Sequence, residues 1–410
     1  MYPQSVTGSL PERIFTATTD GRKVWYTDQF GVLLAAPEGK NFAQAASALG
    51  IDTKSHPTPD SIRFERYSLQ AESKKLLPSQ RVSGCLFRRI SKTSGVSILF
   101  NRNRNQANYG NLARCGSGWV CPVCAAKISE HRKSELKQAI NYHKTIGGFV
   151  FLLTLTNSHN VSDSLMSLKL GQRKAMKHFF ANRQGVELFD LLGKIGHVNA
   201  YEVTHGSNGW HPHHHILVFV KKDVDFTLRQ EIKNGLALHW VECCRKAKLP
   251  LPDLQHGLDL QDGAYADAYV GKWGLEDEMT KGHIKKGKQG GRTPFDLLRA
   301  SRDGDVLAGK LFQEFAIVFK GSRQLVWSRG LKKSLLITDD KSDQEVVEET
   351  EKESEKMLEL DVIQWFAIRG QEQRANLLKS VENDLTLVDA RALIDRCVMA
   401  EIERIQAMLN

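Results

Sequence analysis

Three apolar runs with the character of β-strands lie in the middle of the chain. Residues 148–156 are apolar or β-branched at nearly every position, which is typical of a strand that is buried on both faces. Residues 197–205 and 210–220 form two further runs, joined by the turn Gly206-Ser-Asn-Gly209. An Asn-Gly turn between apolar runs predicts an antiparallel hairpin. The pattern therefore predicts an antiparallel sheet in this part of the chain.

Segments with helical periodicity surround these strands. Apolar positions recur every three or four residues, as on the buried face of an amphipathic helix. The segments with this pattern are 125–143, 162–182, 226–247, 262–273 and 308–319. We therefore expect an α+β fold in which helices flank a central antiparallel sheet.

The ends of the chain differ from its middle. Residues 1–80 are mixed in character and carry no recognisable chemistry. Residues 338–356 are acidic with few apolar positions, which favours a linker, and residues 357–410 return to a periodicity that predicts three short helices. Together with a cysteine-bearing segment at 81–135 and the sheet with its helices at 148–335, the sequence predicts five regions.

Charge and hydropathy restrict the class of protein. The 410 residues carry a net charge of +10, but residues 339–410 alone carry −9, which leaves +19 on residues 1–338. A strongly basic body favours a polyanionic partner such as DNA or RNA, although charge that only maintains solubility gives the same composition. The chain has no secretory signal and no run of about 18 apolar residues, so we expect a cytoplasmic protein that does not contact a membrane.

A cluster of histidines predicts a metal site on the hairpin. Four of the 14 histidines lie within His211-Pro-His-His-His215. Because side chains alternate between the two faces of a strand, His213 and His215 share one face and His214 points to the other. Glu202, on the preceding antiparallel strand, can reach the same face. Two imidazoles and a carboxylate suit a divalent ion and leave positions open for a substrate oxygen. A packed or surface pair is the alternative for a His-x-His motif.

Cysteine spacing indicates a second metal site. The chain has seven cysteines, and Cys121-Pro-Val-Cys124 has the spacing of a metal knuckle, with Cys115 six residues earlier and Cys85 further upstream. The odd number and the cytosolic context argue against a disulfide framework. Four thiolates suit a tetrahedral structural Zn²⁺ ion that would help to hold a short, loop-rich segment together. Reduced, buried cysteines are the alternative.

A helix with two tyrosines is the third candidate. Tyr265, Tyr269 and Trp273 are four residues apart and share a helix face, with Lys272 close to Tyr269. A tyrosine hydroxyl with its ordinary pKa of about 10 is a weak nucleophile, but a metal ion on the phosphate and a nearby cation would make its attack feasible. An aromatic stripe of this kind more often packs in a core, so both interpretations stay open.

Two basic segments follow this helix. The glycine-rich loop 281–292 and the segment that ends at Lys333 suit contacts with phosphate groups, which would make binding depend on salt. A solvated loop is the alternative for the first segment. The residues that we expect to contact DNA are Lys281, Lys285, Lys286, Lys288, Arg292, Arg323 and Arg329.

Taken together, these motifs resemble the rolling-circle replication initiator (Rep) proteins of bacterial plasmids, which belong to the HUH endonuclease superfamily. The resemblance implies an HUH endonuclease-like catalytic domain with metal ligands at His213 and His215 and a third, acidic ligand at Glu202. The family usually has a bulky apolar residue between the two histidines, where this sequence has His214. The stretches that carry the resemblance are 115–128, 153–156, 202–215, 265–280 and 320–330.

The resemblance also implies a reaction. Tyr269 matches the nucleophile of the family, and Tyr265 stands where some members have a glutamate, which favours a second transesterification by Tyr265. We expect the protein to nick single-stranded or hairpin DNA at a plasmid origin with Mg²⁺ or Mn²⁺, forming a 5′-phosphotyrosine link and a free 3′-OH. A helicase and a DNA polymerase would come from the bacterial host, since the chain has no Walker A motif.

Two kinds of alternative remain after the resemblance is considered. A HUH-type transposase or a mobilisation relaxase would use the same catalytic residues. A zinc-containing DNA-binding regulator without catalysis belongs to another class of function. Formation of a covalent DNA adduct separates the regulator from the enzymes.

Overall fold

The structure is a computed structural model of the chain that describes residues 17–20, 23–27, 33–35, 59–261, 291–338, 340–349 and 354–409. The chain divides into two compact units, residues 1–62 and 63–410. The described part of the first unit is a three-stranded antiparallel sheet. Its strands are β1 (Ala17–Asp20), β2 (Lys23–Thr27) and β3 (Leu33–Ala35). All the site residues predicted from the sequence belong to the second unit.

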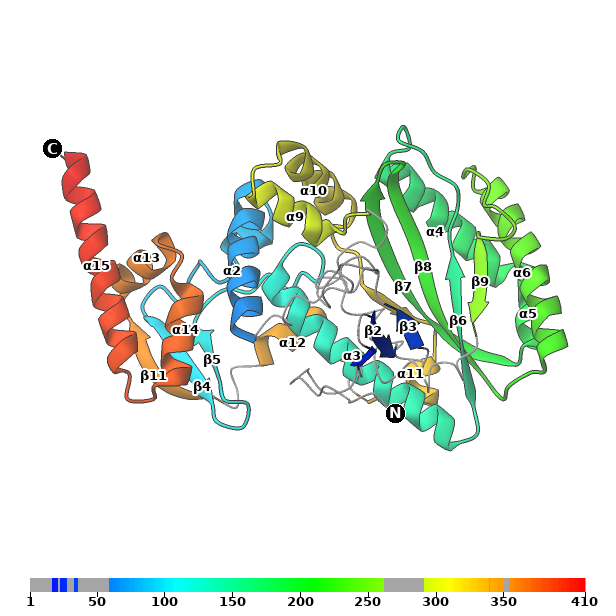
Figure 1. Cartoon of the computed structure of the whole chain (residues 1–410), viewed down its shortest axis with the longest axis horizontal. Coiled ribbons are helices and arrows are strands. Elements are labelled where there is room, and N and C mark those ends of the chain that lie inside the picture. The colour runs from blue at the N-terminus through cyan, green and yellow to red at the C-terminus, as the bar shows by residue number, and fades with distance from the viewer. Residues whose placement is uncertain are drawn as a thin grey trace. The chain divides into compact units, whose positions relative to one another are not determined.

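A five-stranded antiparallel sheet is the larger of the two described sheets in the second unit (Figure 1). Its strands lie in the order β10-β7-β8-β6-β9. They are β6 (Phe149–Leu155), β7 (Lys194–Gly206), β8 (Gly209–Val220), β9 (Leu258–Gln261) and β10 (Leu325–Trp327). The β7–β8 hairpin turns at the predicted Gly-Ser-Asn-Gly segment, where Gly209 has a positive φ of 85° that glycine adopts without strain. The three predicted strands and the hairpin are confirmed.

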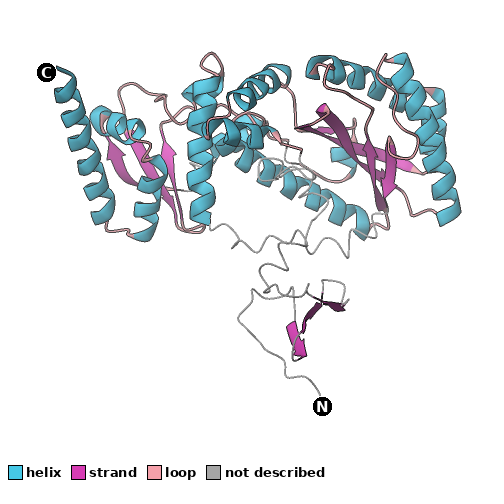
Figure 2. Cartoon of the chain, turned by 45° about the horizontal axis from the view of Figure 1, so that its top comes forward, coloured by secondary structure: helices cyan, strands magenta, loops and turns pink. Residues whose placement is uncertain are grey.

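Helices cover both faces of this sheet, as Figures 1 and 2 show. On one face, Leu217 and Phe219 of β8 pack with Leu136 and Ala139 of α3. On the other face, Ile216 lies in a core that includes residues of α4, α5 and α6. The helices are α3 (Pro122–Thr145), α4 (Leu165–Ala181), α5 (Arg183–Leu191) and α6 (Phe226–Lys246). The predicted α+β fold with a central antiparallel sheet and flanking helices is confirmed.

A second sheet joins distant parts of the chain. β11 (Glu355–Leu360) pairs antiparallel with β4 (Val96–Asn101), which pairs with β5 (Gln106–Gly110). Residues 357–410, expected to be helical, therefore begin within a strand. The three helices that follow are α13 (Val362–Gly370), α14 (Arg374–Asn383) and α15 (Val388–Leu409), of which the last has 22 residues and is not short. Strand β11 forms by pairing with the distant strand β4, so no local periodicity in the sequence predicts it.

The acidic segment 338–356, favoured as a linker by its composition, contains the helix α12 (Asp343–Glu348). Val346 and Val347 of this helix are buried, and Arg132 of α3 donates a hydrogen bond to Asp343 at 2.8 Å. Two adjacent valines are too short a run to predict a packed helix from periodicity. The division of the chain into five regions stays a prediction.

The remaining helices lie before α3 and after β9. They are α2 (Pro59–Leu76), the 3₁₀ helix η1 (Arg81–Gly84), α9 (Pro294–Arg302), α10 (Val306–Val318) and α11 (Leu331–Ser334). The helix predicted at 262–273 lies outside the described residues. Within the described ranges, every helix is too short or too polar to cross a membrane.

Candidate metal centres

The β7–β8 hairpin brings Glu202, His213 and His215 together on one face of the sheet. The strand register places Glu202 directly opposite His213, and His215 opposite Ala200. The Nε2 atoms of His215 and His213 lie 3.3 and 3.6 Å from Oε2 of Glu202. One candidate ligand atom from each of the three residues lies within 4.8 Å of the others. This group could hold a divalent ion and would leave coordination positions for other ligands.

The other ring nitrogen of each imidazole also has a partner. Nδ1 of His215 lies 3.2 Å from the hydroxyl oxygen of Thr154 on β6, and Nδ1 of His213 lies 3.4 Å from the carbonyl oxygen of His211. The side chains of His213, His215 and Glu202 are 15%, 12% and 23% exposed. Both Nδ1 atoms thus have a partner, while the three side chains remain partly exposed to solvent.

The other two histidines of the cluster have different surroundings. His211 lies 2.9 Å through Nε2 from the Thr156 hydroxyl and stacks on His159, and burial with the neighbouring imidazoles lowers the pKa of His211 to about 4. His214 faces the opposite side of the sheet, as predicted, and its Nδ1 lies 2.9 Å from Oδ1 of Asn199. Burial lowers the pKa of His214 to about 3, so its ring is neutral at ordinary pH.

The four predicted cysteines form a second, buried group. Cys85 follows η1, Cys121 caps the N-terminus of α3, and Cys124 lies in its first turn. The Sγ pairs 85–121, 85–124 and 115–124 are 3.7, 3.6 and 3.7 Å apart. Four sulfurs bonded to one Zn²⁺ at about 2.3 Å with tetrahedral angles lie about 3.8 Å from one another. The spacing therefore fits a tetrahedral zinc ion and is too long for disulfides.

Polar side chains from distant helices surround the cysteine group. Nε2 of Gln70 on α2 donates to the Cys85 carbonyl oxygen at 2.9 Å and lies 3.8 Å from Sγ of Cys121. Arg374, at the start of α14, donates to Oε1 of Gln70 at 2.7 Å and to the Leu86 carbonyl oxygen at 3.2 Å. Arg374 is 1% exposed, and burial lowers its pKa from the ordinary arginine value. Burial raises the pKa of the Cys121 thiol, so its thiolate requires a nearby cation.

The tyrosine helix and most of the basic loop lie outside the described residues. Arg292, at the end of that loop, is described, and its guanidinium forms an ion pair with Asp305 at 2.9 Å. Its backbone exchanges two hydrogen bonds of 2.8 Å with His205, near the end of β7. The loop therefore ends beside the hairpin that carries the candidate ligands. The predicted residues outside the described ranges are Tyr265, Tyr269, Lys272, Lys281, Lys285, Lys286 and Lys288.

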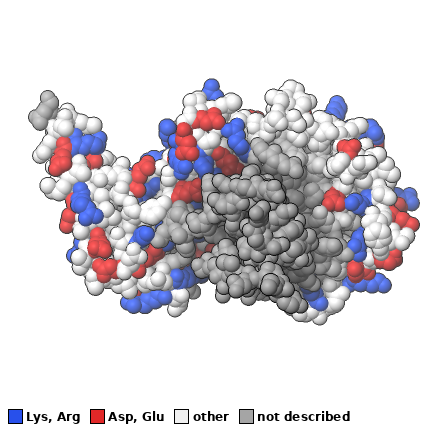
Figure 3. Space-filling model, in the orientation of Figure 1, with Lys and Arg blue, Asp and Glu red and all other residues white. Residues whose placement is uncertain are grey.

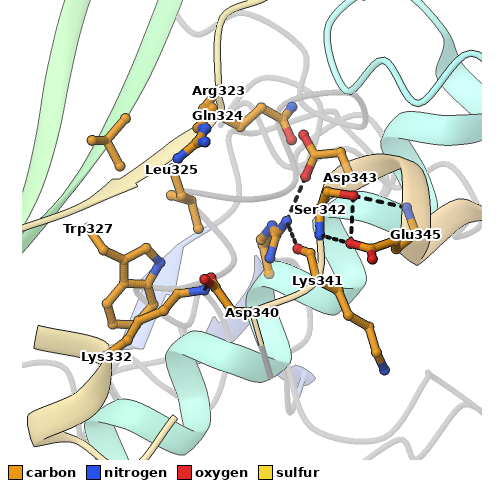
Figure 4. Close-up of a pocket in the computed structure, with 12 residues that line it drawn as sticks. Arg323, Gln324, Leu325, Trp327, Lys332, Asp340, Lys341, Ser342, Asp343 and Glu345 are labelled. Carbon is orange, nitrogen blue, oxygen red and sulfur yellow. Dashed lines mark hydrogen bonds and ion pairs between the residues drawn. The ribbon is translucent and has the colours of Figure 1, made fainter. Parts of the chain in front are cut away.

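Arg323 lines a cavity of about 320 Å³ beside β10, together with Trp327 (Figure 4). Acidic side chains share this cavity, since Asp340 lies 2.9 Å from Lys332 and Asp343 is paired with Arg132. Arg329 is exposed in the turn after β10. On the face shown in Figure 3, basic and acidic side chains of the described residues are likewise interspersed.

Reasoning from the sequence missed the side chains that support the two groups. Thr154 lies behind His215, and Gln70 and Arg374 lie beside the cysteines. Thr154 has a local signal, because it is a polar residue opposite the histidines on an otherwise apolar strand. Gln70 and Arg374 have none, because only the tertiary fold brings α2 and α14 to the cysteines.

Comparisons with known proteins identify a family that matches this chain. A family model described as Replication protein (Rep_1) matches residues 111–375. Protein rep of Streptomyces lividans is 27% identical over 297 residues, a match that covers 55% of this chain and 64% of that protein. Neomycin resistance protein of Streptomyces cyanogenus is 29% identical over 165 residues, which covers 34% of this chain and 35% of that protein. The chain thus spans less than two thirds of the length of either curated relative. No solved structure matches the chain significantly.

Proposed function

The chain belongs to the Rep_1 family of replication proteins, and from this premise we propose that it initiates plasmid replication by nicking one strand of origin DNA. The observation that carries the proposal is the group of Glu202, His213 and His215 on the β7–β8 hairpin. Backbone hydrogen bonds on both sides of β8 hold these side chains in place, and they are partly accessible. We further propose that the five-stranded sheet with its helices is an HUH endonuclease-like fold.

A divalent ion such as Mg²⁺ or Mn²⁺ fits this donor set, because it combines one carboxylate with two neutral imidazole nitrogens. Glu202, His213 and His215 would hold the ion. When bound, it would neutralise charge on the scissile phosphate and polarise it toward attack. The chain's own contribution is orientation, since the sheet fixes where the three ligand atoms point.

Tyr269 is the proposed nucleophile, on the strength of the family resemblance. Its hydroxyl oxygen attacks the phosphorus of the scissile phosphodiester, and the bond from phosphorus to the 3′ oxygen breaks. The products are a 5′-phosphotyrosine and a 3′-OH, which takes up the proton that the tyrosine loses. Lys272 would stabilise negative charge close to the attacking oxygen. Tyr265 is proposed to carry out a second transfer of the same kind that ends the cycle.

The proposed substrate is single-stranded or hairpin origin DNA. Arg292 supports this choice, because its backbone pairs with His205 of β7, and β7 is one strand of the ligand-bearing hairpin. A basic residue is therefore close to the candidate ligands. The other proposed DNA contacts are Lys281, Lys285, Lys286, Lys288, Arg323 and Arg329. The cysteine group is proposed to hold a structural Zn²⁺ ion in a subdomain at 81–135, next to a catalytic domain at 148–335. A host helicase and a DNA polymerase are the proposed partners.

Formation of a covalent adduct tests the proposal. The full-length protein is incubated with Mn²⁺ and a single-stranded origin oligonucleotide that is labelled at its 3′ end, so that the label stays on the fragment joined to tyrosine. We expect a labelled protein band with wild type and with Tyr265→Phe, and none with Tyr269→Phe or His213→Ala. No adduct with wild type under conditions where the DNA binds would refute the enzyme and favour a DNA-binding regulator. An adduct in Tyr269→Phe would assign the attack to another residue.

A further inference from the structure

The strand β6 presents the hydroxyl group of Thr154 to His215 of β8. Thr154 pairs with His215 in the register of the two antiparallel strands, and its Oγ1 lies 3.2 Å from Nδ1 of that ring. Side chains directly opposite each other on paired strands point to the same face of the sheet. The hydroxyl therefore lies behind the imidazole, on the side away from Glu202.

The two nitrogens of His215 face different partners. Nε2 lies 3.3 Å from Oε2 of Glu202, within the candidate ligand group, and Nδ1 faces the Thr154 hydroxyl. An imidazole that binds a metal ion through Nε2 carries its proton on Nδ1, and a hydrogen-bond acceptor there fixes both the tautomer and the orientation of the ring. The Thr154 oxygen is the described atom that supplies this acceptor.

We propose that Thr154 is a positioning residue for the metal group, which holds His215 in the tautomer and orientation that direct Nε2 toward Glu202. This inference rests on the proposed metal site and adds a residue to it. The hydroxyl faces Nδ1 of His215 and not the Nε2 atom beside Glu202, so it acts through the ring of His215. His213 differs, because a backbone carbonyl oxygen, that of His211, lies 3.4 Å from its Nδ1. Of the two candidate imidazole ligands, His215 is the one whose support can be removed by changing a side chain.

The decisive variant is Thr154→Val, which keeps the shape and the strand preference of threonine and replaces only the hydroxyl with a methyl group. Thr154→Ser keeps the hydroxyl and serves as the rescue variant. Thr145→Val is the matched control, because the Thr145 hydroxyl donates to the Tyr142 carbonyl oxygen in the exposed last turn of α3. Thr154→Ala is a second hydroxyl-free variant in case Thr154→Val does not fold.

The measurement is the affinity of the full-length, zinc-loaded protein for Mn²⁺, followed by the electron paramagnetic resonance signal of the free ion. We expect Thr154→Val to bind Mn²⁺ about 10- to 100-fold more weakly than wild type. Thr154→Ser should bind within a few fold of wild type, and Thr145→Val should be unchanged. We expect all the variants to unfold at the same temperature as wild type. Saturating Mn²⁺ should restore nicking by Thr154→Val, because the variant keeps all three candidate ligands.

Three outcomes would overturn the inference. Wild-type affinity in Thr154→Val would mean that the hydroxyl does not support the ring. Equal losses of affinity in Thr154→Val and Thr154→Ser, with a lower unfolding temperature, would assign the residue a purely structural role. If wild type binds no Mn²⁺, or binds it equally well after His213→Ala, both the proposed metal site and this inference fail. If wild type binds Mn²⁺ in a way that depends on His213 and only the Thr154 results differ from expectation, the positioning role alone fails.

Discussion

The two groups of ligating side chains differ in how completely the protein encloses them. Cys85, Cys115, Cys121 and Cys124 are 0–6% exposed, whereas the side chains of the Glu202, His213 and His215 group are 12–23% exposed. Four sulfurs complete a tetrahedral shell and leave no position for a substrate, but three ligands leave the shell open. From this comparison we propose that the cysteines stabilise the structure and that the hairpin carries the chemistry.

The two groups also differ in what holds them in place. The histidines are carried by a sheet whose backbone hydrogen bonds and apolar core do not involve the candidate ligand atoms. The cysteines come from the residue after η1, a loop and the start of α3, and Gln70 and Arg374 connect them to α2 and α14. Loss of the cysteine group should therefore lower the free energy of unfolding, while loss of the histidines should mainly affect metal binding.

Cys121→Ser should have the largest effect on stability. A serine cannot replace a thiolate ligand, and the free energy of binding a structural zinc ion is free energy of folding, so we expect a loss of more than about 4 kcal/mol. Unfolding in urea and the zinc content of the purified protein are measured together. Cys243→Ser, a buried cysteine on α6 outside the group, is the control and should keep its zinc. If wild type contains no zinc and Cys121→Ser is as stable as wild type, the cysteine group does not have the structural role.

Arg374→Met should have the next largest effect. It keeps most of the apolar volume of the side chain but leaves the Gln70 oxygen and the Leu86 carbonyl oxygen without their buried donor, which costs about 3 kcal/mol. We also expect a chelator to remove zinc faster, because the guanidinium lies beside the cysteines. Arg391→Met, an exposed position on α15, should change stability by less than about 0.5 kcal/mol. Equal unfolding of the two variants would show that Arg374 does not support the cysteine group.

His197 is an imidazole of β7 outside the candidate metal group, in contrast to His213 and His215 of β8. Its ring stacks on Phe180 at 3.9 Å, and burial lowers its pKa from 6.5 to about 3. Between these values the unfolded chain binds a proton that the folded protein does not, so the stabilisation is complete above pH 6.5 and is lost as pH falls toward 3. Between pH 7 and pH 5 we expect His197 to lower the free energy of unfolding by about 2 kcal/mol. The free energy of unfolding of His197→Phe should fall by about that much less over the same range.

The control for the pH dependence is His256→Phe, because the side chain of His256 is 83% exposed. Urea unfolding of wild type and both variants at pH 7, 6 and 5 gives the three slopes. Identical slopes in wild type and His197→Phe would mean that His197 takes up its proton in the folded protein.

His213→Ala should have the smallest effect on stability and the clearest effect on metal binding. Its side chain is partly exposed and lies at the polar end of the sheet face, so we expect the free energy of unfolding to change by less than about 1 kcal/mol. Mn²⁺ affinity, measured by titration calorimetry, should fall at least about 100-fold, because one of three side-chain ligands is lost. His178→Ala, on the exposed side of α4, is the control. If His213→Ala is as unstable as Cys121→Ser, the comparison between the two groups fails.

Much of the candidate hairpin site could be predicted from the sequence, because its determinants are local. Alternation in 210–220 places His213 and His215 on one face, and the Gly-Ser-Asn-Gly turn sets the register that brings Glu202 opposite His213. The spacing of Cys121 and Cys124 likewise depends on a single helix turn. The roles of Tyr265 and Tyr269 stay predictions, since both lie outside the described residues.

The sequence by itself determined three of the five strands of the central sheet, the shared face of the histidines and the four-cysteine set, since periodicity, turn chemistry and ligand spacing operate over a few residues. Only the tertiary structure decided that β11 pairs with β4, that α12 packs its two valines, and that Arg374 reaches Gln70 beside the cysteines. It also placed Thr154 behind His215. These contacts join residues that are far apart along the chain, and no local pattern specifies which distant partner a buried polar group or an unpaired strand edge will meet.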